Sequence, residues 1–269
     1  MGFSVLMSVY CKEKPEYLRQ AFESLLSQTL LPDEVVLIKD GPLTEALEAV
    51  IADQKERFAR MVVFAFEENV QLGRALAKGV KLCTMELIAR MDTDDVALPD
   101  RFAHQYTFLQ QHPEVSVVGG WMEEFNDEGT YQSVKQMPEK NEEIRRYGRY
   151  RNPVNHMTVM MRKDDVLRAG NYRHFPYLED YELWSRMLAD GMVFYNLQEV
   201  LVRMRNNSDV YERRGGIAYA RNYFALRREQ RALGRLTRGE YLVSLCLTFG
   251  ITLQPGFLRK LIYRRLLRK

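Results

Sequence analysis

Three carboxylates occupy four consecutive positions, at Asp92, Asp94 and Asp95. They follow an apolar stretch long enough for a buried strand, and Pro99 then opens a helix. Carboxylates this close repel one another unless a cation lies among them, and hard oxygen ligands suit Mg²⁺ or Mn²⁺ carrying a phosphate-bearing substrate. The spacing therefore predicts a divalent metal site. The alternative is an Asp-rich turn, with Asp100 merely favouring the start of the following helix.

Two further acidic positions could do chemistry. Asp40 ends an apolar stretch before Gly41 and could accept hydrogen bonds from a nucleobase or ribose, although a turn aspartate fits equally well. Glu179 and Asp180 begin a predicted helix, where the helix dipole keeps a carboxylate ionised and able to take a proton. An ordinary acidic first turn is the alternative there. His156 precedes another apolar stretch and fits a structural histidine as well as a ligand.

Other site types are excluded or unsupported. The chain has no Gly-rich phosphate loop, so any phosphate must be held by metal. The three cysteines, Cys11, Cys83 and Cys246, are odd in number and far apart, which predicts free thiols.

Strands and helices alternate over the first half of the chain. The predicted strands are 3–10, 34–41, 61–66, 86–91 and 115–122, and the predicted helices start at Pro15, Thr44, Leu72 and Pro99. This order predicts an α/β fold with a mostly parallel sheet and helices on both faces. The carboxyl ends of parallel strands form a ligand crevice, and Asp40 and Asp92 lie on that rim.

After Trp121 the regular alternation of strands and helices ends. The pattern predicts a turn at 126–129 between two short strands, helices at 142–150, 163–169 and 179–188, and strands at 156–161, 193–197 and 200–204. These strands indicate an antiparallel or mixed extension of the sheet. From Gly215 onward only helices are predicted, at 217–233, 239–251 and 257–267.

Charge is distributed unevenly. Residues 201–269 carry 16 Lys and Arg against 4 Asp and Glu, whereas residues 1–200 carry 23 against 32. Such a basic tail suggests an acidic partner, either anionic lipid or nucleic acid. The helix at 257–267 favours a membrane surface over packing on the domain. No stacking aromatic motif or nucleic-acid module accompanies the charge, so we expect no nucleic acid.

The start of the chain, Met1–Val5, lacks a secretory signal, and no apolar run approaches the roughly 18 residues of a spanning helix. We therefore expect a cytoplasmic protein, peripheral on the inner face of the cytoplasmic membrane.

Four segments together resemble family 2 inverting glycosyltransferases of the GT-A fold. They are VLMSVY at 5–10, DEVVLIKDG at 33–41, ARMDTDD at 89–95 and EDYELW at 179–184. The resemblance covers roughly residues 3–205 and is greatest to bacterial members that build capsule, exopolysaccharide or O-antigen repeats. It implies a GT-A (Rossmann-like) domain over 1–208 and a basic, membrane-associating helical extension over 209–269.

The resemblance also implies a role for each matching residue. Asp94, with Asp92, would bind Mn²⁺ or Mg²⁺, and Asp180 would be the catalytic base. Nucleotide-binding residues would be Val9, Tyr10, Asp40, Asn69, Asp92 and Thr93, and the donor or acceptor would be positioned by Asp95, His156, Glu179 and Trp184.

Three departures from the family pattern affect the same site. Gln71 replaces a common Gly, Lys39 replaces the first Asp of an Asp-Asp-Gly, and Arg203-Met204-Arg205 stands where many relatives have Arg-x-His. The first two bear on nucleotide recognition, and the third leaves the further metal ligands open.

The implied activity is metal-dependent transfer of a sugar from a nucleotide-sugar donor, expected to be UDP-linked, to a lipid-linked saccharide acceptor. A sugar-phosphate nucleotidyltransferase is one alternative, but it would need a Gly-rich loop where this chain has Tyr10–Lys14. A non-catalytic nucleotide-sugar-binding subunit of a polysaccharide assembly complex is the other.

Overall fold

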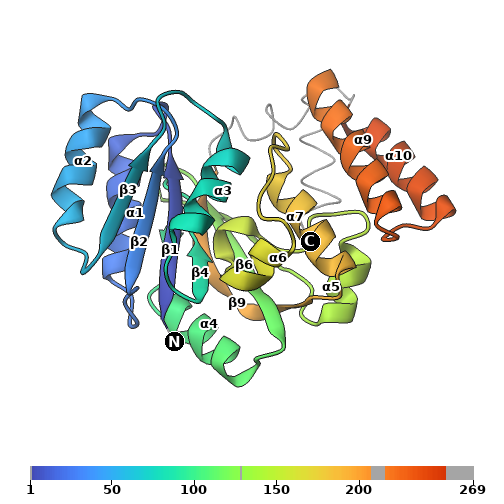
Figure 1. Ribbon diagram of the computed structural model, residues 1–269, viewed down its shortest axis with the longest axis horizontal. Coiled ribbons are helices and arrows are strands. Elements are labelled where there is room, and N and C mark those ends of the chain that lie inside the picture. The colour runs from blue at the N-terminus through green and yellow to red at the C-terminus, as the bar shows by residue number, and fades with distance from the viewer. Residues whose placement is uncertain (1, 128, 207–215, 253–269) are drawn as a thin grey trace.

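The structure, a computed structural model, describes residues 2–127, 129–206 and 216–252 (Figure 1). A nine-stranded sheet runs through it in the order β3-β2-β1-β4-β8-β6-β9-β5, with β7 paired to β6. The strands are β1 Phe3–Val9, β2 Glu34–Lys39, β3 Met61–Ala65, β4 Leu87–Arg90, β5 Val96–Ala97, β6 Val115–Phe125, β7 Tyr131–Lys135, β8 Met160–Arg162 and β9 Val193–Arg205. The helices are α1 Pro15–Leu26, α2 Glu45–Lys55, α3 Leu72–Leu82, α4 Arg101–Gln111, α5 Asn141–Tyr147, α6 Lys163–Arg168, α7 Glu179–Ala189, α9 Ile217–Ala232 and α10 Arg238–Thr252.

One half of the sheet is parallel and the other is mixed. Strands β3, β2, β1 and β4 pair in parallel. Strand β8 is antiparallel to both β4 and β6, and β6 then pairs in parallel with β9. This arrangement confirms the predicted α/β fold and its mixed extension.

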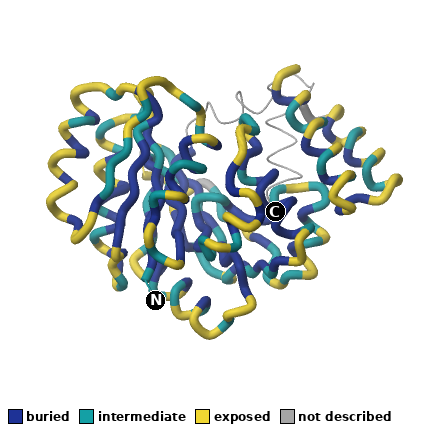
Figure 2. The backbone as a smooth tube through the Cα atoms, viewed as in Figure 1, coloured by how far each residue is buried: buried dark blue, intermediate teal, exposed yellow. Residues whose placement is uncertain are grey.

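Helices cover both faces because β1 is apolar on both sides. Val5 and Met7 belong to one hydrophobic core together with α1, α2 and α4. Leu6 belongs to a second core, together with α3, α6 and α7. Figure 2 shows the strands buried between helices whose outer sides are exposed.

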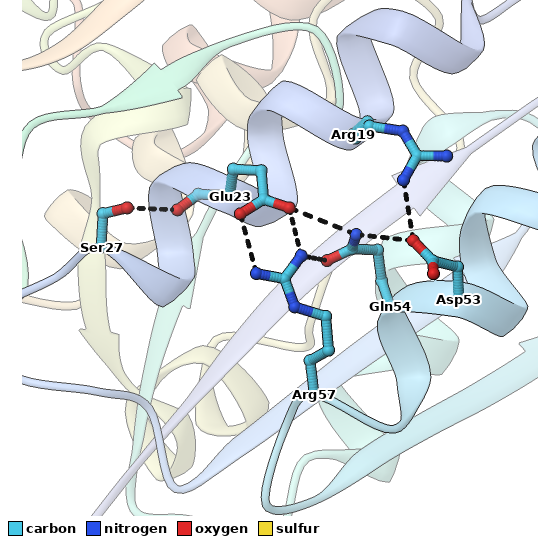
Figure 3. A network of polar contacts seen from close by, with 6 residues as sticks. All are labelled: Arg19, Glu23, Ser27, Asp53, Gln54 and Arg57. Atoms are coloured by element: carbon cyan, nitrogen blue, oxygen red, sulfur yellow. Dashed lines mark hydrogen bonds and ion pairs between the residues drawn. The ribbon is translucent and has the colours of Figure 1, made fainter.

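Helix starts follow local sequence. Pro15 is the first residue of α1, and the hydroxyl of Thr44 accepts a 3.3 Å hydrogen bond from the amide of Leu47 at the start of α2. Figure 3 shows α1 joined to the end of α2 by ion pairs of Arg19 with Asp53 and Arg57 with Glu23. These side chains are about half exposed, so solvent screens the pairs and each contributes little to stability.

Two predicted strand assignments were wrong. Residues His156–Thr158 form a 3₁₀ turn, closed by the amide of Thr158 donating to the carbonyl of Asn155, so the strand begins only at Met160. The late strands at 193–197 and 200–204 are a single strand, β9. Register shifts against β6 absorb the residues between them, as β-bulges do.

The chain continues into α9 and α10, which lie side by side next to α7 (Figure 1). Their bounds confirm the predicted helices at 217–233 and 239–251 to within two residues. The predicted helix at 257–267 lies outside the described residues. No helix in the described part of the chain is long and apolar enough to cross a membrane.

Candidate active site

The predicted nucleotide and metal residues come together at the carboxyl ends of the parallel strands. Tyr10 follows β1, Asp40 follows β2, and Asp92 follows β4, and these three strands are hydrogen-bonded neighbours. The acidic loop Asp92–Asp95 then leads into the short strand β5, which pairs with the end of β9.

The acidic loop is crowded with negative charge. Burial raises the pKa of the Asp94 carboxyl to about 7, and the negative charges of Asp92 and Glu13 add to the shift. Burial also raises the pKa of Asp95, with Asp94 and Asp92 contributing. One oxygen of Asp95 accepts a 2.9 Å bond from the amide of Arg205, and the other has no partner among the described residues. A divalent cation would relieve this repulsion.

The chain by itself offers an incomplete metal site. Among the described residues, no three or more His, Cys, Asp or Glu side chains are grouped to hold a metal. Asp92 and Asp94 fit the smaller requirement of Mg²⁺, which is commonly held by one or two carboxylates together with substrate phosphates and water. The donor set is therefore consistent with a metal that arrives with a diphosphate.

Arg205, at the end of β9, braces the acidic loop. Its Nε donates to the carbonyl of Asp94 at 3.2 Å, and its guanidinium lies 3.9 Å from the ring centroid of Tyr17. On the other side of the loop, the hydroxyl of Thr93 donates to Glu13 at 2.7 Å. The sequence marked Arg205 only as a departure from the family pattern, and its bracing role was not predicted.

Arg90 is a further residue that sequence reasoning missed. It is completely buried at the end of β4 and donates to the carboxylate of Asp92, while its Nε and Nη1 have no partner among the described residues. A charged residue at the end of an apolar strand was the available signal.

Asp40 and Asn69 hold the loop between β3 and α3. The carboxylate of Asp40 accepts a 2.7 Å bond from the amide of Val70, and the side chain of Asn69 donates to the carbonyl of Asp40 at 3.2 Å. Burial raises the pKa of Asp40, although amide donors from Val70 and Gln71 oppose the shift. The structure thus joins two predicted nucleotide residues. Val9 nearby is buried and Tyr10 is 37% exposed.

The start of α3 closely approaches the segment that precedes α7. A Cβ on Gly73 would lie 2.1 Å from the carbonyl oxygen of Arg173, so only glycine fits there. Gln71, just before α3, has φ of 71°, which is costly for a side-chain-bearing residue.

Asp180 lies in the first turn of α7, as predicted. One of its oxygens accepts a 2.7 Å bond from the amide of Tyr181, and the other accepts from the side chain of Asn152. Burial raises the pKa of Asp180. Burial also raises the pKa of Glu179 to about 7, with the charges of Asp180 and Asp92 contributing. The charge of Asp92 thus contributes to the raised pKa of Glu179.

A cavity of about 350 Å³ lies beside Asp180. His156 and Asn155 line it from the sheet side, and Tyr219 and Tyr223 line it from α9. The Nε2 of His156 is 2.9 Å from the hydroxyl of Tyr172. Burial, together with the charge of Arg90, lowers the pKa of His156 well below its ordinary value, so the ring is neutral near pH 7.

Trp184 was predicted to position substrate, but it lies in the second hydrophobic core and does not line the cavity. Its ring packs edge-on against His156, with centroids 6.1 Å apart. Any effect of Trp184 on substrate therefore passes through His156.

Comparison with known proteins finds glycosyltransferases, both by a family model and by individual relatives. The family model described as glycosyl transferase family 2 matches residues 4–170. The amylovoran biosynthesis glycosyltransferase AmsE of Erwinia amylovora is 44% identical over 231 residues, covering 86% of each chain. The UDP-Gal:alpha-D-GlcNAc-diphosphoundecaprenol beta-1,3-galactosyltransferase of Escherichia coli is 34% identical over 268 residues, covering 99% of this chain and 97% of its own.

Solved structures share the fold at low sequence identity. TarS 1-349 of S. aureus in complex with UDP-GlcNAc superposes with a TM-score of 0.72 at 16% identity, covering 99% of this chain and 76% of that one. The mannosyltransferase PcManGT of Pyrobaculum calidifontis, in complex with GDP-Man and Mn²⁺, gives a TM-score of 0.64 at 12% identity and covers 98% and 79%.

Proposed function

The chain belongs to glycosyl transferase family 2, and from this premise we propose that it transfers a sugar from a UDP-sugar, with inversion, to a hydroxyl of a lipid-linked saccharide. The GT-A fold was predicted correctly. The observation that carries the proposal is the placement of the half-buried carboxylate of Asp180 in a cavity that none of the residues Asp92–Asp95 line. The donor can therefore bind at the acidic loop while the acceptor enters through the cavity beside Asp180.

The relatives support the proposed substrates. The name of the E. coli relative specifies a UDP-Gal donor and a diphosphoundecaprenol-linked GlcNAc acceptor, and AmsE belongs to amylovoran biosynthesis. The TarS complex holds UDP-GlcNAc.

On the donor side, Asp94 and Asp92 would hold Mn²⁺ or Mg²⁺ through their carboxylate oxygens. When bound, the ion supplies Lewis-acid stabilisation to the departing diphosphate. Arg90 fixes the direction of Asp92 through their hydrogen bond, and Arg205 fixes the backbone of Asp94. Val9, Tyr10, Asp40, Asn69 and Thr93 would surround the nucleotide.

On the acceptor side, Asp180 would take the proton from the acceptor hydroxyl as that oxygen attacks the anomeric carbon. The new glycosidic bond forms on the face opposite the leaving nucleotide diphosphate, so one displacement inverts the anomeric configuration. Asn152 and the amide of Tyr181 hold the carboxylate in one orientation. Burial brings its pKa closer to neutral pH, which favours general-base catalysis. Glu179 and His156 would position the acceptor.

The proposal places the enzyme at the cytoplasmic face of the membrane. Helix α10 supports this location because it buries polar side chains and exposes apolar ones. Ser244 and Thr248 are buried. Leu242, Val243 and Phe249 are 62%, 52% and 61% exposed. An exposed apolar face of this kind marks a binding surface. Six basic and no acidic residues follow in 257–269, a combination suited to anionic lipid.

The test of the function is Asp180→Asn. The variant should retain UDP and metal binding but lose transfer by a factor on the order of 10² or more, measured as UDP release with a saccharide acceptor. Asp190→Asn, at the exposed C-terminal end of the same helix, is the matched control. UDP release by Asp180→Asn at the wild-type rate would contradict the assignment. Wild-type protein that binds UDP-sugar but never releases UDP would favour the non-catalytic subunit.

A further inference from the structure

Among the described residues, more cationic side chains than carboxylates line the cavity beside Asp180. Three cationic side chains line it, Lys135, Arg151 and Arg227, against two carboxylates, Asp180 and Glu124. Glu124 is buried and accepts hydrogen bonds from Ser133 and Asn206 at 3.1 and 3.0 Å. The cavity is therefore suited to an anionic ligand.

Arg227, from α9, brings a positive charge to the cavity, and none of its hydrogen bonds goes to a carboxylate. It is buried, and its bonds go to neutral oxygens: the carbonyls of Arg149 and Tyr150, the hydroxyl of Tyr181 and the side chain of Gln230. Its Nε has no partner among the described residues. A buried cation in neutral surroundings is costly, and a nearby anion would offset that cost.

Lys135 and Arg151 reach the same space from two other segments. Lys135 ends β7, and its charge is close enough to Asp180 to lower the pKa of that carboxyl, against the larger effect of burial. Arg151 follows α5, and its guanidinium lies 5.7 Å from the ring centroid of Tyr147. Both side chains line the cavity within reach of solvent.

Part of the cavity lining is aromatic. The ring centroids of Tyr177 and Tyr219 are 5.8 Å apart, and those of Tyr219 and Tyr223 are 5.2 Å apart, so the three rings form a continuous surface. All three line the cavity. An aromatic lining with a few placed charges is the usual composition of a small-molecule site, and the rings can pack against the C–H faces of a sugar.

We propose that this cavity binds the first sugar and the diphosphate of the acceptor, with Lys135 and Arg151 contacting the diphosphate and Tyr219 and Tyr223 packing on the sugar. The inference rests on the proposed function and deepens it by naming an anionic acceptor. None of the residues Asp92–Asp95 line the cavity, which distinguishes it from the proposed metal and donor site. Leu247 of α10 also lines the cavity and is 49% exposed, so a lipid chain can leave along the apolar face of α10.

Two acceptors carrying the same sugar test the proposal, one linked to a prenyl diphosphate and the other a neutral alkyl glycoside. In Lys135→Gln/Arg151→Gln, the KM for the diphosphate acceptor should rise at least tenfold. The KM for the neutral glycoside and for the UDP-sugar should stay within about twofold. Lys140→Gln, an exposed lysine that does not line the cavity, is the control. An equal change of KM for both acceptors would overturn the proposal.

A binding measurement separates this proposal from the proposed function. Farnesyl diphosphate is titrated into the full chain carrying Asp180→Asn, with UDP and Mg²⁺ saturating the donor side. The double substitution should weaken binding at least tenfold. If this loss is seen while the wild type transfers to neither acceptor, the diphosphate site stands and the proposed function fails. If farnesyl diphosphate binds equally well with and without Lys135 and Arg151, the diphosphate site is refuted.

Discussion

The buried guanidinium of Arg90 donates a hydrogen bond to the carboxylate of Asp92 across the end of β4. Arg90 is inaccessible to solvent, whereas the side chain of Asp92 is 31% exposed. The arginine is therefore a fixed support, and the aspartate presents its free side to the donor crevice.

Removing either partner should expose this coupling. Arg90→Met leaves a hydrocarbon of similar length but frees Asp92, and Asp92→Asn leaves a buried cation without its counter-charge. We expect each to lower the free energy of unfolding, with an interaction energy of about 1–3 kcal/mol between them in a double-mutant cycle. Urea unfolding measures this interaction energy, and Arg168→Met, at a largely exposed arginine paired with Asp165, is the control. Simple additivity would show that the two residues act independently.

Metal binding should depend on Asp94 and not on Asp100. The side chain of Asp94 is half-buried, and the negative charges of Asp92 and Glu13 help to raise the pKa of its carboxyl, whereas Asp100 is an exposed residue before α4. With UDP present, Asp94→Asn should raise the Kd for Mn²⁺ at least tenfold and Asp100→Asn should leave it unchanged, as read by calorimetry. Removing the metal with EDTA should stop transfer. Equal Mn²⁺ affinity in wild type and Asp94→Asn would favour the simple turn.

Glu179 should make stability fall with rising pH. Its pKa is raised from 4.5 to about 7, chiefly by burial, so between these values the folded protein holds a proton that the unfolded chain releases. The stabilisation is present below pH 4.5 and is lost as the pH rises through 7, amounting to at most about 3 kcal/mol. Glu179→Gln should remove this component.

The measurement is the free energy of urea unfolding at pH 5 and pH 8. Between these pH values, wild type should lose more stability than Glu179→Gln, whereas the exposed substitution Glu142→Gln should follow wild type. Identical pH dependence in wild type and Glu179→Gln would mean that the carboxyl at position 179 titrates normally.

Membrane attachment should depend on both the basic tail and α10. Removing residues 255–269 should abolish sedimentation with vesicles containing anionic phosphatidylglycerol, because about 1 kcal/mol is contributed by each basic residue near the surface. Leu242→Ser/Phe249→Ser should reduce sedimentation while leaving the cationic charge unchanged. Added salt should release Leu242→Ser/Phe249→Ser from the vesicles more readily than wild type. Undiminished sedimentation of the truncated chain would refute the prediction.

The parallel half of the sheet could be predicted because each of its strands and helices is marked by residues within its own segment of the sequence. A strand buried on both faces reads as a continuous apolar run, as in β1, and Thr44 and Pro15 mark helix starts by their own chemistry. Asp92, Asp94 and Asp180 could be proposed as site residues from the sequence because each lies at the end of a strand or the start of a helix, and their roles stay predictions. The continuity of β9 was missed because its pairing with β6, far away in sequence, sets its length.

Residues that act through distant partners were also missed. Lys135 reaches the cavity only because β7 pairs with β6, and the site of Arg227 exists only because α9 packs beside α7. Nothing near either residue in the sequence points to Asp180. The same applies to Trp184, whose place in the core follows from packing against Phe194 and His156.

The aromatic wall of Tyr219 and Tyr223 comes from a helix beyond the segment matched by the family model. A fragment ending at residue 208 would keep the acidic loop and Asp180 but would lose one side of the pocket. Chimaeras that exchange α9 and α10 between relatives should therefore exchange the glycan that is extended while keeping the sugar that is added. The acceptor that is extended and the sugar that is added can therefore change independently in evolution.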